Sequence, residues 1–234
     1  MDNEEIYFNF PVHLLQNACQ DIRETMNNII DYAGYVHTLN LKNGNDEKKM
    51  LAAGKYFKIR YGSPKGSFEK GRMLFNSKPQ NLPMTGININ ILFEFYRNPK
   101  TEYEIIVLLA FLAFKSIIGN KQYACISNNF MLSRMAGFSN MVEKEQLPEP
   151  MCYYKRWTID KIKAELCDKW NLSIYGYRMN GFYCSLKLST DELAEVAEEK
   201  RLRCKLRNHN GQQKKAREKA IENLYKKLTS KPTT

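Results

Sequence analysis

The residues best suited to chemistry in this 234-residue chain are basic side chains gathered near its C-terminal end. Residues 200–219 hold nine lysines and arginines against one acid, Glu218. Such a run binds polyanions, because lysines and arginines that contact phosphates release the condensed counterions. The whole chain carries a formal net charge of +11, which also favours a polyanionic partner. The alternative interpretation is a solvated helix whose acidic residues simply come earlier in the chain.

Catalytic patterns are missing from the sequence. Gly66-x4-Gly71 resembles half of a phosphate-binding loop, but Arg72 and Met73 follow where lysine and serine or threonine are needed. No nucleophile elbow and no His-Glu-x-x-His helix is present. We therefore assign no catalytic residue and no cofactor.

Cysteines and histidines also lack the spacing of a metal site. The six cysteines contain no C-x-x-C pair, and His13 and His37 have no second histidine at ligand spacing. No secretory signal opens the sequence, so we expect reduced cysteines that act as small core residues in a cytoplasmic protein. The longest apolar run, residues 105–114, is too short to cross a membrane.

The first hundred residues predict a helical region with one long loop segment. Apolar residues at steps of three and four predict a helix over residues 11–39, which starts at its proline, and a second helix over 46–57. Residues 60–86 are rich in glycine and proline, which predicts loops around one short element at 68–75. Residues 87–96 fit a helix better than a strand.

A sharper pattern begins at Thr101. Together with Glu104 it forms a capping-box signature for a helix that ends at residue 118. A short strand at 122–126 and a helix at 128–136 follow, the latter capped by Ser127. A third helix is expected over residues 158–170, capped by Thr158, with its lysines facing solvent.

A hairpin follows the third helix. Asn180-Gly181 predicts a two-residue type I′ turn, since both residues accept a positive φ. That register pairs Met179 with Phe182, Tyr177 with Cys184 and Tyr175 with Leu186, all on one apolar face. The opposite face would be mostly solvated.

This order of elements, and the capped segment 126–137 in particular, resembles the winged helix-turn-helix proteins over residues 101–188. In that family the third helix usually enters the major groove and the wing touches the backbone or minor groove. The resemblance implies DNA contacts from Lys161 and Lys163 on the third helix and from Arg178 on the wing. The chain departs from the family pattern at residues 138–156, where the family has only a short turn.

Lys155 and Arg156 precede the third helix, where the backbone dipole and basic side chains both attract phosphate. Further along, Ser189 caps a C-terminal helix whose acidic residues come first and whose basic residues follow. His209-Asn210-Gly211 predicts a break before a second helical stretch over 212–228.

These observations predict a mainly α protein with a helical N-terminal domain (1–100), a winged-helix-like domain with a small β-hairpin wing (101–188) and a basic helical tail (189–234). We expect a DNA-binding protein without catalytic activity, as a transcription regulator or as a replication or mobile-element accessory factor. The expected partner is double-stranded DNA and not a membrane. The candidate nucleic-acid-binding residues are Lys155, Arg156, Lys161, Lys163, Arg178, Lys200, Arg201, Arg203, Lys205, Arg207, Lys214, Lys215, Arg217 and Lys219.

Two other functions stay open. One is a protein-interaction scaffold whose winged helix is structural and whose basic tail only improves solubility. The other is a nucleic-acid-processing enzyme with its site in the loop-rich residues 60–86. The N-terminal domain is the candidate site for a ligand or a dimer partner. For the chain as a whole, a homodimer and a protein partner both stay open.

Overall fold

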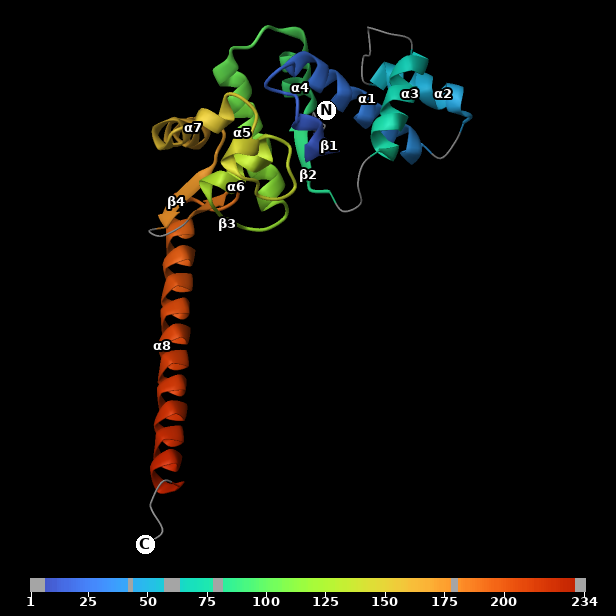
Figure 1. Cartoon of the computed structure of the whole chain (residues 1–234). Helices are drawn as coiled ribbons and strands as arrows, with labels where there is room; N and C mark the ends of the chain where they lie inside the picture. Colours follow the sequence, from blue (N-terminus) through green and yellow to red (C-terminus); the bar gives the residue numbers. More distant parts are fainter. Residues whose placement is uncertain (1–6, 42–43, 57–63, 78–81, 178–180, 230–234) are drawn as a thin grey trace.

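The computed structural model describes residues 7–41, 44–56, 64–77, 82–177 and 181–229. Within these ranges the chain has eight α-helices and two small antiparallel sheets, so the predicted mainly α class is confirmed (Figure 1). The α-helices are α1 (Ile22–Asn40), α2 (Asp46–Tyr56), α3 (Pro64–Asn76), α4 (Ile89–Arg97), α5 (Glu102–Ile118), α6 (Asn128–Met135), α7 (Arg156–Lys169) and α8 (Thr190–Thr229). The strands are β1 (Tyr7–Pro11), β2 (Met84–Asn88), β3 (Ala124–Ile126), β4 (Ser173–Tyr177) and β5 (Gly181–Ser185). Short 3-10 helices are η1 (Val12–Leu15), η2 (Lys144–Gln146) and η3 (Met151–Tyr153).

The N-terminal segment was predicted wrongly as the start of a helix. Pro11 is the last residue of β1, which pairs antiparallel with β2 so that Phe8 lies opposite Ile87. The helix begins only at Ile22, where the Asp21 carboxylate accepts a hydrogen bond from the Glu24 amide at 2.8 Å. The local apolar spacing could not reveal β1, because its partner strand lies far away in the sequence.

Helix α3 corrects the expectation that residues 60–86 form loops around a short element. It spans Pro64–Asn76 and packs against α1, and β2 follows. At Gly71 the two helices touch: an added Cβ would lie 2.2 Å from the Asp31 carbonyl oxygen. The glycines of the half phosphate-loop pattern are therefore part of a helix, and Gly71 permits a close helix crossing.

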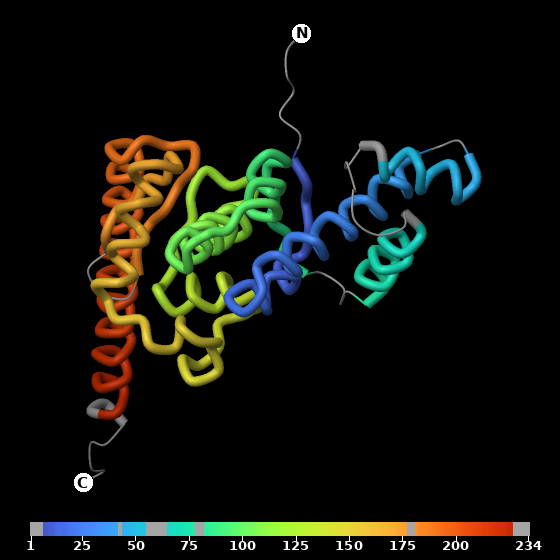
Figure 2. Tube along the Cα trace, turned by 90° about the horizontal axis from the view of Figure 1, so that it is seen from above, coloured from blue at the N-terminus to red at the C-terminus, as the bar shows by residue number. Residues whose placement is uncertain are grey.

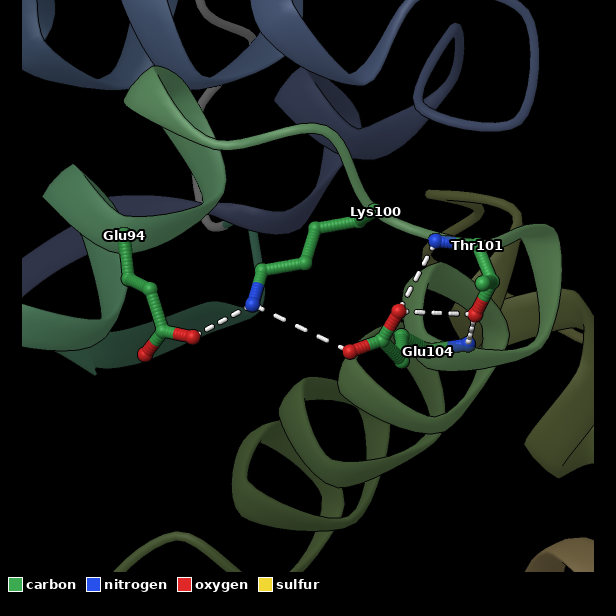
Figure 3. A network of polar contacts seen from close by, with 4 residues as sticks. All are labelled: Glu94, Lys100, Thr101 and Glu104. Atoms are coloured by element: carbon green, nitrogen blue, oxygen red, sulfur yellow. Dashed lines mark hydrogen bonds and ion pairs between the residues drawn. The ribbon is translucent and has the colours of Figure 1, made fainter.

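The junction between α4 and α5 is held by polar contacts (Figure 3). The predicted capping box is confirmed: the Glu104 amide donates to Thr101 Oγ1 at 3.2 Å, and the Thr101 amide donates to Glu104 Oε2 at 2.8 Å. Lys100 Nζ pairs with the Glu94 carboxylate and lies 3.8 Å from Glu104 Oε1. These contacts fix the direction in which α5 leaves α4.

Helix α5 lies at the centre of one continuous apolar core. Leu108, Leu109 and Leu112 are fully buried, and the core extends from Phe8 in β1 to Cys184 in β5. The Thr85 hydroxyl of β2 donates to the Leu112 carbonyl at 2.7 Å, which ties the first sheet to α5. The domain boundary near residue 100 stays a prediction.

The second sheet has the strand order β3-β5-β4, and its register differs from the predicted one. Tyr177 lies opposite Gly181 and Tyr175 opposite Tyr183, so three residues (178–180) connect the strands where a two-residue turn was expected. The predicted pairing was wrong because it assumed one solvated face. Strand β5 is central and buried on both faces, so alternation along it does not determine the register.

Helix α8 is continuous from Thr190 to Thr229, so the predicted break at His209-Asn210-Gly211 is wrong. Figure 1 shows its first turns lying beside β4 and β5 and the rest running away from the body. In Figure 2 the α1–α3 group and α8 lie on opposite sides of the molecule. The long helix is therefore an extension of the α5–β5 half of the chain.

Cysteine burial differs from the expectation of small core residues. All six cysteines are free, and Cys184 is buried, but Cys125, Cys167 and Cys204 are exposed. Across the described ranges, no three His, Cys, Asp or Glu side chains are grouped so that they could hold a metal ion. No described helix combines the length and the apolar character needed to cross a membrane.

Candidate nucleic-acid interface

The exposed part of α8 gathers the largest group of predicted binding residues. Every residue from 202 to 226 is exposed, and among the described residues no other element covers this stretch. It carries half of the fourteen basic candidates on one helix: Arg203, Lys205, Arg207, Lys214, Lys215, Arg217 and Lys219. The structure thus brings together residues that the sequence had divided between two helical pieces.

The sequence explains why α8 begins where it does. Ser189 caps the helix as predicted: the Glu192 amide donates to its hydroxyl at 3.3 Å, and its own amide donates to the Glu192 carboxylate at 2.8 Å. The capping contacts lower the pKa of Glu192. The two acids of the first turn, Asp191 and Glu192, match the positive end of the helix dipole.

The first turns of α8 anchor it to the second sheet. Leu193 and Ala197 are buried against Tyr183, and the Tyr175 hydroxyl donates to Glu198 Oε1 at 2.9 Å. The Lys200 ammonium lies 5.1 Å from the centre of the Tyr123 ring. The helix therefore leaves the protein surface at about the position of Lys200.

Residue 201 marks the start of the projecting segment. Arg201 is half-buried and its Nε lies 3.0 Å from the Glu198 carboxylate. Arg203 pairs with Glu199 at 2.5 Å, and Lys214 lies 4.0 Å from Glu218. Exposed pairs of this kind contribute little free energy, so these cations can exchange their partners for phosphates.

The N-terminal end of α7 offers a second, smaller set of cations. The helix begins at Arg156, two residues before the predicted Thr158 cap, and Lys155 is its N-cap. The Arg156 side chain is 90% exposed and lies 3.6 Å from Asp160. Lys161 is also exposed, with its ammonium 4.7 Å from the centre of the Tyr103 ring. These three residues can reach a ligand, but Asp160 reduces their local positive charge.

Lys163 was predicted to face solvent, and this prediction is wrong. Its side chain is only 13% exposed, donates to Asn128 Oδ1 at 2.7 Å and lies 3.6 Å from the centre of the Phe182 ring. Burial lowers the pKa of this amine. Four residues after Ile159 and three before Leu166, it lies on the buried side of α7, where it joins α7 to α6 and β5.

Arg178, the predicted wing contact, lies outside the described residues.

Two features of the candidate interface were not predicted from the sequence. Trp157 is 68% exposed beside Arg156, and one side of α8 carries no charge between its basic residues. The helical spacing of the α8 residues could have revealed the second feature, but the assumed break at Gly211 divided the pattern.

A cavity of about 470 Å³ lies between α4, α5 and α7. Its wall includes three carboxylates (Glu94, Glu104 and Glu165) and two amines (Lys100 and Lys169). Lys169 pairs with Glu165 at 2.6 Å, and Lys100 pairs with the other two acids. Because three carboxylates outnumber two amines, the lining is net negative and does not favour phosphate, so α8 and the start of α7 are the better candidates for the interface.

Comparisons with family models, curated proteins and solved structures gave no significant match to this chain.

Proposed function

We propose that this protein binds double-stranded DNA without chemistry, and that α8 supplies most of the binding free energy. The observation that carries the proposal is the projecting segment of α8, residues 202–226, which carries eight basic residues against two acids. A polyanion can approach this segment from every side, because residues 202–226 are exposed. A protein of this kind acts as a transcription regulator or as an accessory factor in replication or DNA mobility.

Counterion release predicts how strongly the affinity for DNA should depend on salt concentration. About six to eight phosphate contacts along α8 would give a slope of about −5 to −7 in a plot of log affinity against log salt. Binding would therefore be tight at low salt and weak at high salt. A solubilising tail would produce no such slope.

The order of elements supports a winged-helix role for residues 101–188 within this proposal. Helix α5 is followed by β3, α6, α7, β4 and β5, and the three strands form a sheet in the order β3-β5-β4. In the proposed complex the start of α7 adds contacts from Lys155, Arg156 and Lys161. Lys163 holds α7 in place and contacts no DNA.

A matched pair of variants tests the proposal by fluorescence anisotropy with a random-sequence DNA duplex over a salt series. The first replaces Lys205, Arg207, Lys214 and Lys215 with glutamine. The second removes four exposed lysines elsewhere: Lys48, Lys65, Lys121 and Lys144. We expect the α8 variant to reduce the slope by about 3–4, and the control variant to keep it. Equal effects, or no binding by the wild-type protein at low salt, would refute the proposal.

A protein-interaction role is the second candidate, and one observation favours it. Near its C-terminal end α8 exposes Ile221 (53%), Leu224 (59%) and Tyr225 (66%), which are apolar or aromatic side chains on neighbouring turns. Salt-independent behaviour in the anisotropy experiment would favour this role. Alanine at all three positions would then abolish self-association or partner binding in analytical ultracentrifugation.

A further inference from the structure

We propose that α8 lies in the major groove of B-form DNA, with the phosphates of both strands contacting its two basic sides. This inference rests on the proposed function and goes further: it specifies the groove, the orientation of the helix and the side that meets the bases. It is drawn from how the side chains are distributed around the helix. Net charge alone would not distinguish the groove from the outer backbone.

The basic residues of α8 form two stripes. Because an α-helix turns by about 100° per residue, positions three, four or seven apart share a side. One stripe contains Arg203, Arg207, Lys214 and Arg217. The other contains Arg201, Lys205, Lys215 and Lys219. The two stripes lie on nearly opposite sides of the helix.

An uncharged strip lies between the two stripes, and we call it the floor strip. It consists of Leu202, Leu206, His209, Gln213, Ala216 and Ala220. The His209 and Gln213 side-chain nitrogens lie 3.0 Å apart, so the two polar groups share this side. Glutamine side chains bind adenine edges, and small apolar side chains contact thymine methyl groups. The floor strip therefore has the chemistry needed to face base edges.

The side of α8 opposite the floor strip indicates which side of the helix is turned away from the DNA. Cys204, Gly211, Glu218 and Glu222 lie opposite the floor strip. Both acids of the projecting segment are therefore on the side turned away from the DNA. With the floor strip inward, both carboxylates point away from the base edges, and Glu218 lies 4.0 Å from Lys214 of the first stripe.

The dimensions select the major groove of DNA. An α-helix with its side chains is about 10–12 Å across, and the major groove of B-DNA is about 12 Å wide. The minor groove, about 6 Å wide, is too narrow for a helix. Duplex RNA has a deep, narrow major groove that side chains cannot reach. A helix lying along one strand would use a single basic side, whereas α8 has two.

Two variants with equal charge distinguish the groove from the outer backbone. The floor variant combines Gln213→Glu with Ala216→Glu. The outer variant combines Cys204→Glu with Gly211→Glu. Both add two acids to the exposed part of α8, but on opposite sides. Circular dichroism of each purified variant checks that helix content is kept, and anisotropy measures the Kd for a DNA duplex.

We expect the floor variant to bind at least about tenfold more weakly than the outer variant, and the wild-type protein to prefer duplex DNA to duplex RNA of the same sequence. If the two variants bind equally and wild-type binding still falls steeply with salt, groove insertion is wrong and the proposed function stands. If the wild-type protein binds neither duplex, both proposals are wrong.

Discussion

At the scale of single residues, Lys163 shows how burial changes the role of a charged side chain. Its ammonium is enclosed between Asn128 and the Phe182 ring, so it positions α7 against the sheet. We expect Lys163→Ala to lower the free energy of unfolding by about 1–3 kcal/mol, because Asn128 loses a charged hydrogen-bond donor. The salt slope of DNA binding should not change. Urea denaturation and anisotropy check the two expectations, and a smaller slope would identify a phosphate contact.

The buried carboxyl of Asp31 should make the free energy of unfolding depend on pH. Burial raises the pKa of its carboxyl from 3.8 to about 6, although a hydrogen bond from Ser67 and the charge of Lys70 act in the opposite direction. Since the folded pKa is the higher one, the unfolded chain loses this proton first. The free energy of unfolding should therefore fall by roughly 2–3 kcal/mol as the pH rises from 4 to 6.

Asp31→Asn is the variant that isolates this effect. The asparagine has no charge to bury, so the fall in stability between pH 4 and 6 should disappear and the variant should be the more stable protein at pH 7. Chemical denaturation at several pH values provides the measurement. Parallel pH profiles for both proteins would show that another group is responsible.

Replacing glycine with alanine should change stability in opposite directions at two positions. Gly71→Ala places a Cβ 2.2 Å from a backbone oxygen of α1, so we expect a loss of about 2–3 kcal/mol as the crossing helices separate. Gly211→Ala meets no atom within 4 Å on α8 and should stabilise that helix by about 1 kcal/mol. Thermal melting reports the first change, and helix content by circular dichroism reports the second.

At the scale of elements, the sequence was informative wherever a local contact determines a boundary. The caps at Thr101, Ser127 and Ser189 each rely on a partner three residues away, and all three helices start as predicted. Predictions from the sequence were wrong where a distant contact determines the structure. Strand β1 forms by pairing with β2, and the register of β4 and β5 depends on α8, which covers the outer face of the sheet.

The sequence predicted the placement of the candidate residues only in part. The basic residues after position 200 were found from composition, and the structure places most of them on one exposed helix. Lys163 was misplaced because it borders an apolar stripe, and helical spacing alone cannot show that α6 and β5 enclose its side chain. Its position is decided by tertiary packing that no single segment contains.

At the scale of the whole molecule, the body and the projecting part of α8 have separate energetic roles. The last buried side chains are Leu193 and Ala197, which form a small cluster with Tyr183, and residues 202–226 bury no side chain. We expect a chain ending at residue 203 to keep the melting temperature of the full protein and to lose most of its salt-dependent DNA binding. Calorimetry and anisotropy provide the two measurements. A large drop in melting temperature would show that the distal helix supports the body.

Because the capped start of α8 is fixed on the second sheet, the order of charges along this helix also affects the rate of association. Because the acidic residues of this helix lie next to the body and its basic residues lie beyond, the molecule carries a large permanent dipole along α8. A polyanion's field would turn the freely diffusing protein so that the projecting end arrives first. Orientation before contact raises association rates well above those of random encounters and makes them fall as ionic strength rises. In the proposed complex, the distribution of charge along this helix would thus set how fast the protein finds DNA, as well as how tightly it binds.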